Sequence, residues 1–294
     1  MPILTATQIR KNAEQAVKRL ADCNFCPRGC RVNRLAGELG YCRIGREALV
    51  SSYGPHFGEE RLLVGRGGSG TVFFAGCNLL CVFCQNEDIS HGLAGHAVSD
   101  VAMSEMFFSI QEYGCHNLNL VTPSHVVPQI LSALAYAMEN GFRLPVVYNT
   151  GGYDRLDTLR LLEGVVDIYM PDLKFMDVEV SEKMAQAPDY PAVAQAAIKE
   201  MHRQVGDLAL DARGIARRGL LVRHLVMPND LAGTQAAMGF LAAEVSRETY
   251  VNIMGQYRPC HEAFSYPEIS RRPTRDEMER AFEAARQAGL TRLD

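Results

Sequence analysis

The stretch TVFFAGCNLLCVFCQN, residues 71–86, joins an apolar run to three closely spaced cysteines. The run TVFFAG (71–76) is rich in β-branched and aromatic residues and predicts a strand. Cys77, Cys81 and Cys84 follow in the loop that leaves this strand. Three thiolates are one ligand short of a closed structural zinc site, and iron–sulfur clusters are also bound by cysteine thiolates. The stretch therefore predicts a catalytic centre at a strand end, either a zinc ion or a cluster with one open iron.

Beyond this stretch, apolar strand-like runs alternate with amphipathic helical runs. The predicted strands are TVFFAG (71–76), NLNLV (117–121), PVVYN (145–149), VDIYM (166–170), LLVRHLV (220–226) and YVNIM (250–254). Helical periodicity lies between them, near residues 100–113, 125–140, 154–163, 178–204 and 233–246. Strands joined by crossover helices form a parallel sheet with right-handed connections. An open or closed barrel fits this α/β pattern better than a doubly wound sheet.

Two segments of different composition flank the predicted core, which spans residues 67–255. Residues 1–66 hold a helical pattern and then a stretch rich in cysteine and glycine, with too few apolar residues for a core of its own. Residues 256–294 hold a loop with proline and arginine and then a helix from Thr274 to Gly289. Because this last segment follows the final strand, we expect it to cover the active-site end of the core.

The N-terminal segment carries a second group of cysteines. Cys23, Cys26, Cys30 and Cys42 have the spacing C-x2-C-x3-C-x11-C. Four thiols are enough for one complete metal site, and metal ligation would stabilise a segment that burial cannot. Zinc and a second [4Fe-4S] cluster are both compatible with this spacing, which differs from that of two-cluster ferredoxins.

Composition excludes several classes of protein. Of 294 residues, 47% are hydrophobic and 22% charged, which is typical of a globular chain, and the net charge of −4 provides no basic field for nucleic acid or an anionic membrane. The nine cysteines cannot all pair, and we find no apolar run long enough for a membrane span or a secretory signal. We therefore expect a cytoplasmic protein, with Cys115 buried and Cys260 near the mouth of the core.

The motif CNLLCVFC resembles the CxxxCxφC signature of the radical S-adenosylmethionine (SAM) superfamily, in which φ is aromatic and here is Phe83. The resemblance extends over most of the chain, to the PflX-like branch related to pyruvate formate-lyase activating enzymes. The segments that carry it are CPRGCRVNR, CQN, NLNLVTPSH, YNTGGY, MPDLKF and QYRP…YPEISRR. This resemblance implies a partial (β/α)6 barrel, and a [4Fe-4S] cluster on Cys77, Cys81 and Cys84 with SAM on the fourth iron.

The resemblance also implies an activity. One electron would cleave SAM to methionine and a 5′-deoxyadenosyl radical, and this radical would abstract hydrogen from a substrate. The protein would then be an oxidoreductase. The substrate is either a glycyl-radical enzyme, which this protein would activate, or a peptide or small molecule. The alternative from a different functional class is that the protein is a non-catalytic metal-binding module. We expect an electron donor such as flavodoxin or ferredoxin, and neither a membrane nor a nucleic acid as partner.

Polar residues at the strand ends are the candidates for binding SAM. A GGE-like motif is usual after the second strand in enzymes that this chain resembles, but LVTPSH stands there instead. Side chains alternate along a strand, so Arg223 and His224 point to opposite faces, and we expect Arg223 to point inward toward SAM or substrate. The candidate SAM ligands are Asn119, Thr122, Asn149, Thr150, Asp172, Lys174 and Arg223.

Overall fold

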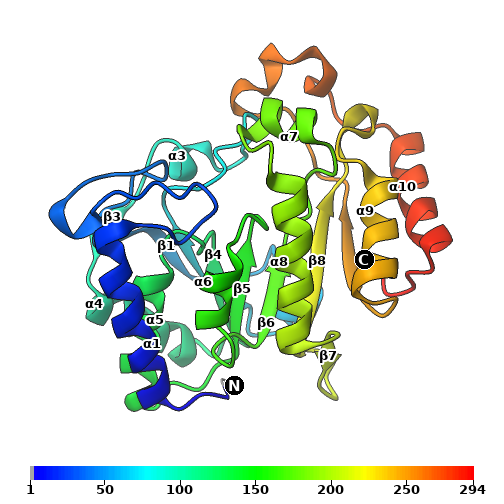
Figure 1. The fold of residues 1–294 in the computed structure, drawn as a ribbon. Coiled ribbons are helices and arrows are strands. Elements are labelled where there is room, and N and C mark those ends of the chain that lie inside the picture. Colours follow the sequence, from blue (N-terminus) through cyan, green and yellow to red (C-terminus); the bar gives the residue numbers. More distant parts are fainter. Residues whose placement is uncertain (1–2) are drawn as a thin grey trace.

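Strand β2, which leads into the first cysteine motif, lies inside a mixed sheet (Figure 1). The computed structural model describes residues 3–294. The strand order is β3-β1-β2-β4-β5-β6-β8-β7, and β9 pairs with β8. The strands are β1 (Ala48–His56), β2 (Ser69–Phe74), β3 (His96–Val98), β4 (Leu118–Val121), β5 (Val146–Thr150), β6 (Ile168–Pro171), β7 (Ala209–Leu210), β8 (Ala216–Leu225) and β9 (Tyr250–Met254).

The six strands expected from the sequence are present and pair in chain order. The neighbours β2-β4-β5-β6-β8-β9 are all parallel. The prediction of an α/β fold with a central sheet is therefore confirmed. In a parallel run the carboxyl ends of all strands lie at one edge, which is where binding sites of α/β sheets form. The loop that carries Cys77 leaves β2 at this edge.

The edges of the sheet differ from the prediction of a purely parallel sheet. Strand β1 pairs antiparallel with β2 and also with β3, and β7 pairs antiparallel with β8. The outer half of β1 is largely exposed, so its sequence lacks the continuous apolar run that marks the inner strands. Phe25, Ile44 and Val50 are buried in the main hydrophobic cluster, so burial does help to hold the N-terminal segment. Residues 3–66 therefore pack against the predicted core, across the predicted boundary between residues 66 and 67. Residues 1–2 of the predicted first segment lie outside the described residues.

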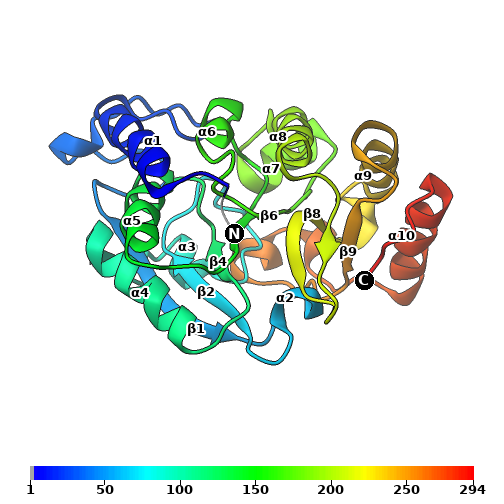
Figure 2. The same cartoon turned by 90° about the horizontal axis from the view of Figure 1, so that it is seen from below.

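Helices cover the outer side of the arc that the strands form in Figure 2. Helix α1 packs against α5, and the predicted helix at 178–204 is two helices, because Gln186 is left-handed and Pro191 starts the next helix. The helices are α1 (Ala6–Arg19), α2 (Arg61–Val64), α3 (Glu87–Ser90), α4 (Asp100–Glu112), α5 (Val127–Glu139), α6 (Leu156–Leu161), α7 (Val178–Ala185), α8 (Tyr190–Val205), α9 (Thr234–Phe240) and α10 (Arg275–Ala288).

Two predicted helices can be checked at their ends. The helix expected from Thr274 to Gly289 is α10, which begins with a capping box at Thr274 and ends at a left-handed Gly289. The helix expected at 233–246 is α9, which continues into a π-helical turn, Leu241–Val245. No helix among residues 3–294 is long and apolar enough to cross a membrane.

The concave side of the sheet is divided between an apolar and a polar half. Val147, Ile168, Met170 and Leu221 form a separate buried cluster toward the amino ends of the strands, and Leu63 of α2 packs into it. Polar side chains lie toward the carboxyl ends, where β5 and β8 carry Asn149 and Arg223 and Asp172 directly follows β6. Because the amino-end half of this face is apolar and the carboxyl-end half is polar, a polar ligand can bind at the carboxyl ends of the strands.

The ends of β5 and β6 are tied together by one buried hydroxyl. Tyr190 at the start of α8 is fully buried. Its hydroxyl accepts the Lys174 amide N–H at 2.9 Å and donates toward the carbonyl oxygens of Gly151 and Asp172, at 2.9 and 3.0 Å. Gly152 has a positive φ of 80°, and a Cβ there would lie 2.3 Å from the Asp172 carbonyl oxygen, so the turn after β5 requires glycine at this approach.

Replacing Tyr190 with Phe tests this link. The variant leaves the Lys174 amide and two carbonyl groups without their buried partner, so we expect the free energy of unfolding to fall by about 1–3 kcal/mol. Urea unfolding followed by circular dichroism measures it. Tyr136→Phe is the control, because Tyr136 is exposed, and its effect should stay below about 0.5 kcal/mol. Equal effects of the two variants would contradict the role of the Tyr190 hydroxyl.

Candidate functional site

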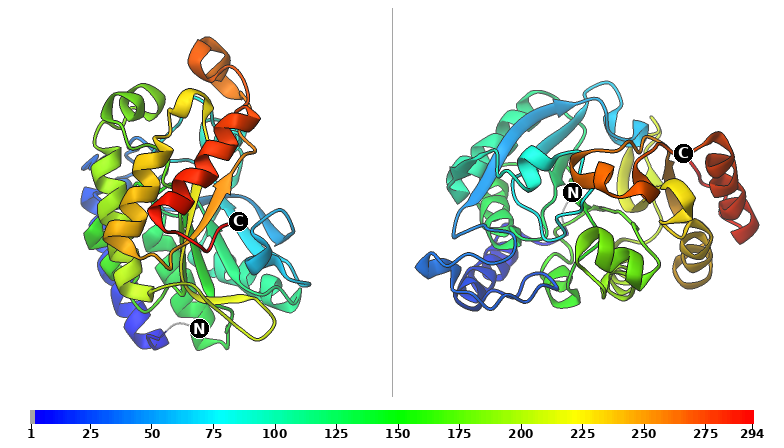
Figure 3. Two further views of the ribbon diagram at one scale, coloured as in Figure 1. Left: turned by 90° about the vertical axis from the view of Figure 1, so that its right-hand side faces the viewer. Right: turned by 90° about the horizontal axis from the view of Figure 1, so that it is seen from above.

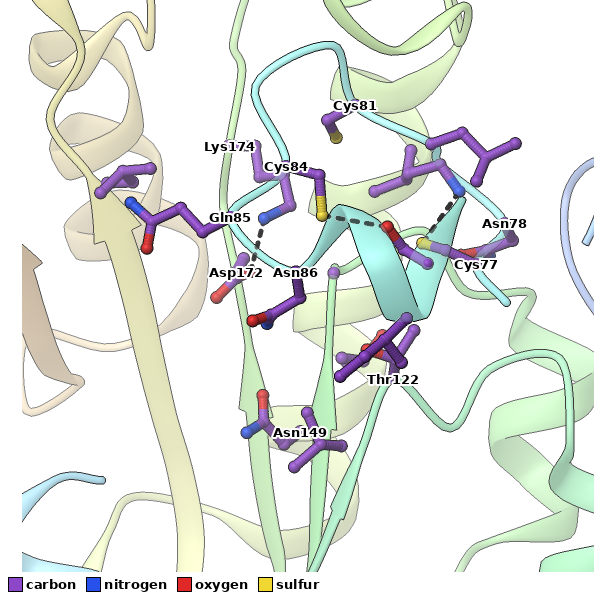
Figure 4. Close-up of a pocket in the computed structure, with 18 of the residues that line it drawn as sticks. Cys77, Asn78, Cys81, Cys84, Gln85, Asn86, Thr122, Asn149, Asp172 and Lys174 are labelled. Carbon is purple, nitrogen blue, oxygen red and sulfur yellow. Dashed lines mark hydrogen bonds and ion pairs between the residues drawn. The ribbon is translucent and has the colours of Figure 1, made fainter. Parts of the chain in front are cut away.

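A cavity of about 280 Å³ opens at the carboxyl ends of the parallel strands. Figure 4 shows the three cysteines on the loop after β2, with Lys174 beside Cys84 and Asn149 farther down on its strand. The side chains that line the cavity include Cys77, Cys81, Cys84, Gln85, Asn86, Thr122, Asn149, Thr150, Asp172, Lys174, Arg223, Met254 and Gln256. The cavity thus collects thiols, amides and an ion cluster from six separate segments.

Two of the three thiols are held in place by groups that are close to them in the chain. The Leu79 amide donates to Cys77 Sγ at 3.3 Å, and Ser90 Oγ lies 3.1 Å from Cys84 Sγ. Burial raises the pKa of Cys77, and it raises the pKa of Cys81 to about 12. Metal ligation requires deprotonated thiols, so these groups need a metal centre to become thiolates at neutral pH.

The spacing of the donors indicates what kind of group fits. Among residues 3–294, no three His, Cys, Asp or Glu side chains converge as the ligands of one metal ion. Zinc thiolates lie about 2.3 Å from the ion, which would bring the sulfurs together. The sulfurs of Cys77, Cys81 and Cys84 instead face a shared cavity. This arrangement fits an iron–sulfur cluster, whose irons and sulfides occupy the space between the cysteine sulfurs, better than a single zinc ion.

A buried ion cluster lines the same cavity as the thiols. Asp172 accepts hydrogen bonds from Lys174 Nζ at 2.6 Å and from Arg223 Nε at 2.8 Å. Arg223 Nη2 also donates to Asn149 Oδ1 at 2.7 Å. Burial tends to raise the pKa of Asp172, but the two cations outweigh it and hold that pKa below its ordinary value. The cluster therefore carries two positive charges and one negative charge.

The expected orientation of the fifth parallel strand is observed. Arg223 points into the cavity, whereas His224 is fully buried on the other face, between the Leu173 carbonyl and Thr234 Oγ1 at 2.7 and 2.9 Å. Burial lowers the pKa of His224, so the ring stays neutral and structural. The lone histidine beside Arg223 is thus part of the packing between the sheet and α9.

The remaining predicted SAM ligands occupy different depths. Thr122 lines the cavity with a φ of 61°, a strained conformation for a β-branched residue and one typical of functional sites. Thr150 also lines it, but its Oγ1 donates to buried Asp154 at 2.6 Å. Asn119 is fully buried farther down β4 and donates to Ser69 Oγ at 3.3 Å. Six of the seven candidates therefore border the cavity, and Asn119 does not.

A second, open cavity of about 370 Å³ continues from the first past Arg223, Met254 and Gln256. Glu59 and Glu60 line it together with Asn252 of β9. Asn252 of β9 donates to Glu60 Oε1 at 3.1 Å, and burial raises the pKa of Glu59. These carboxylates were missed by sequence reasoning because they lie in the link between β1 and β2, outside every motif.

Residues of the segment after β9 contact the cysteine loop and α3. The Glu262 amide donates to the Val82 carbonyl at 2.9 Å, and His261 Nδ1 lies 2.7 Å from Glu87 Oε2. Figure 3 shows this orange segment beside α3. Cys260 at its start is half-buried, and Cys115 is buried between α4 and β4 as predicted. The loop with the three thiols is thus covered by chain from the far end of the sequence.

The four N-terminal cysteines are brought together apart from this cavity. Cys23, Cys26, Cys30 and Cys42 line a second small cavity beside His125. His125 lines this second cavity and does not line the first.

Replacing Asp172 with Asn tests the ion cluster. The variant removes the carboxylate that Lys174 and Arg223 share and leaves Lys174 buried without its ion-pair partner, so we expect the free energy of unfolding to fall by about 3–5 kcal/mol. Denaturant unfolding measures the change. The matched control is Glu279→Gln, which removes a carboxylate from an ion pair with Arg275 that is largely exposed, and it should cost less than about 1 kcal/mol. A loss in Asp172→Asn no larger than in the control would show that the cluster is not stabilising.

Comparison with known proteins places the chain. No family model matches it. It is 36% identical over 279 residues to the uncharacterized protein MJ0674 of Methanocaldococcus jannaschii, an alignment that covers 92% of this chain and 75% of that protein. Its structure matches that of a radical SAM methyltransferase from Sphaerobacter thermophilus, with a TM-score of 0.53 and 14% identity. That match covers 76% of this chain and 65% of the other, just under two thirds of its length. The chain therefore has the fold seen in a radical SAM methyltransferase, and it belongs to the same family as protein MJ0674.

Proposed function

We propose that this protein is a radical SAM enzyme whose six parallel strands form a partial (β/α)6 barrel. Cys77, Cys81 and Cys84 would bind a [4Fe-4S] cluster, and SAM would bind to the iron that has no protein ligand. The observation that carries the proposal is the shared cavity, in which the three thiols face a polar edge in a fold found in a radical SAM methyltransferase. The cluster, when bound, supplies the electron that cleaves SAM to methionine and a 5′-deoxyadenosyl radical.

The chain's own residues would hold the amino-acid part of SAM. In the Asp172–Lys174–Arg223 cluster two cations share one carboxylate. Glu59 and Glu60 also attract Arg223, so Lys174 is the cation that best suits the carboxylate of SAM. Asp172 and Asn149 supply oxygen acceptors close by for an ammonium group. The alternative is that the cluster only closes the rim of the sheet as an internal ion pair. The position of Lys174 Nζ and Arg223 on the wall of the cavity supports the binding role.

The substrate proposal has two versions. In the first, the protein is a PflX-like activase that abstracts hydrogen from a glycine of a partner enzyme. In the second, it modifies a peptide or a small molecule, and the absence of a GGE-like motif after β4 favours this version. A glycyl radical detected on a partner by electron paramagnetic resonance supports the first, whereas a new product mass formed with 5′-deoxyadenosine supports the second.

Two further parts of the proposal concern partners and metals. A flavodoxin or ferredoxin in the cytoplasm would donate the electron, and nucleic acid is not proposed as a substrate because the net charge is −4. Cys23, Cys26, Cys30 and Cys42 would bind a second metal centre, either zinc or an iron–sulfur cluster.

Reductive cleavage of SAM is the direct test. Protein reconstituted anaerobically with iron and sulfide should release 5′-deoxyadenosine from SAM and dithionite. Cys77→Ala, Cys81→Ala and Cys84→Ala should each abolish release, because a cluster with two protein ligands is not retained. Cys115→Ala is the control and should keep full activity, since Cys115 lies outside the cavity. Wild-type protein that holds iron at the three cysteines and still releases no 5′-deoxyadenosine would overturn the proposal.

Lys174→Met separates SAM binding from cluster binding. Without its ammonium group the ion cluster becomes a neutral Asp172–Arg223 pair, so we expect SAM affinity to fall about tenfold, which is about 1.4 kcal/mol. Equilibrium dialysis on the reconstituted variant measures the affinity, with iron content as the check that the cluster remains. Lys199→Met, at an exposed ion pair with Glu244, should leave the affinity unchanged. Unchanged affinity in Lys174→Met would remove Lys174 from the proposed SAM site.

A further inference from the structure

The cavity lined by the four N-terminal cysteines has the features of a built site. Two turns bring them together: the Cys23 amide donates to the Val32 carbonyl at 2.9 Å, and the Arg31 amide donates to the Cys23 carbonyl at 2.8 Å. The Tyr41 amide donates to Cys30 Sγ at 3.3 Å. A Cβ at Gly40 would lie 2.9 Å from Cys30 Sγ, so the backbone there approaches the sulfur as closely as glycine allows. Amide groups that donate hydrogen bonds to sulfur orient and stabilise metal-bound thiolates.

A buried positive charge faces these thiols. Arg34 is only 2% exposed, and its Nη1 donates to the His125 carbonyl at 2.8 Å and lies 3.8 Å from Cys23 Sγ. Its Nη2 is buried without a hydrogen-bond partner, and within residues 3–294 Arg34 forms no ion pair with a carboxylate. An uncompensated buried charge is costly. Four metal-bound thiolates would supply the missing negative charge next to it.

The separation of the thiols distinguishes between metals. A tetrahedral zinc ion holds each sulfur about 2.3 Å from the metal, so four zinc ligands lie close together around one point. However, no three of these side chains converge as ligands of one ion in the described chain. A [4Fe-4S] cluster keeps its four cysteine sulfurs farther apart, because irons and sulfides lie between them.

The same segment contacts the catalytic loop directly. Arg28 Nε donates to the Asn78 carbonyl at 2.8 Å, and the Arg28 guanidinium stacks on Tyr41 at 3.9 Å. His125, which lines the four-cysteine cavity, contacts the Ala75 carbonyl through Nε2 at 2.9 Å. Ala75 lies two residues before Cys77, so a single hydrogen bond separates the wall of one cavity from the strand that leads into the other.

From this geometry we propose that Cys23, Cys26, Cys30 and Cys42 bind a [4Fe-4S] cluster, which passes electrons to the catalytic site. A low-potential protein donor of one electron would reduce this cluster and become oxidised. The cluster would then return to its oxidised state by reducing the centre at Cys77, Cys81 and Cys84 by one electron. The identity of the metal is independent of the proposed function, whereas the electron-transfer role rests on it.

Metal analysis tests the identity of the site. Anaerobically reconstituted wild-type protein should hold about eight irons and eight sulfides with no zinc, since each [4Fe-4S] cluster has four of each. Cys26→Ser and Cys77→Ala should each lose half of the iron, and Cys115→Ser should lose none. Wild-type protein with about four irons and one zinc, or with four irons in total, overturns the assignment. The wild-type count decides this point even if Cys26→Ser fails to fold.

The role of Arg34 is tested by the reduction potential of the N-terminal cluster rather than by enzymatic activity. Arg34→Met removes a positive charge near Cys23, so the reduction potential of the N-terminal cluster should shift to a more negative value in an anaerobic titration followed by electron paramagnetic resonance. The signal of the other cluster should keep its potential. An unchanged potential for both clusters would show that the second cluster does not lie beside Arg34.

Electron transfer is tested by comparing two reductants. In Cys26→Ser, dithionite should still drive release of 5′-deoxyadenosine, because a small reductant reaches the catalytic centre directly. Flavodoxin-driven release should fall at least tenfold. Equal flavodoxin-driven rates in wild type and variant overturn the relay and leave the metal assignment standing. Two clusters in a protein that never cleaves SAM would overturn the proposed function alone.

Discussion

The carboxylate of Asp172 connects the parts of the carboxyl edge on which the site is built. It accepts hydrogen bonds from Lys174 on its own segment and from Arg223 on β8, and Arg223 reaches on to Asn149 of β5. Three neighbouring strands thus end in one hydrogen-bonded group rather than in three independent side chains. Because the group is buried, these contacts are screened little by water, and each partner restricts the orientation of the others.

The covering of the cysteine loop follows a similar principle. This loop has little regular structure, and it is positioned by contacts from distant segments: Arg28 from the N-terminal side and Glu262 from the C-terminal side. Two backbone carbonyl groups of the loop, those of Asn78 and Val82, accept their hydrogen bonds from these segments. The two flanking segments therefore shape the site, although neither contributes a thiol to the main cavity.

Charge is distributed unevenly around the two groups of cysteines. Lys174 and Arg223 face the first group, and Arg34 faces the second. Burial raises the pKa of Cys26 to about 12 and also raises the pKa of Cys81 to about 12, so the thiols alone do not balance these cations at neutral pH. A protein chain that buries cations beside neutral thiols gains a counter-charge once the thiols ligate a metal, which couples metal binding to stability.

The sequence alone determined the order of the parallel strands, the loop position of Cys77, Cys81 and Cys84, and the inward direction of Arg223, because these depend on local apolar runs, spacing and alternation. Only the tertiary structure decided which polar residues reach the cavity, since Asn119 and Thr122 belong to one motif but lie at different depths. Three further features could not be predicted: the antiparallel pairing of β1, the cavity lined by Glu59 and Glu60, and the contact of Arg28 with the cysteine loop. Each depends on contacts between segments far apart in the chain, which no local sequence pattern encodes.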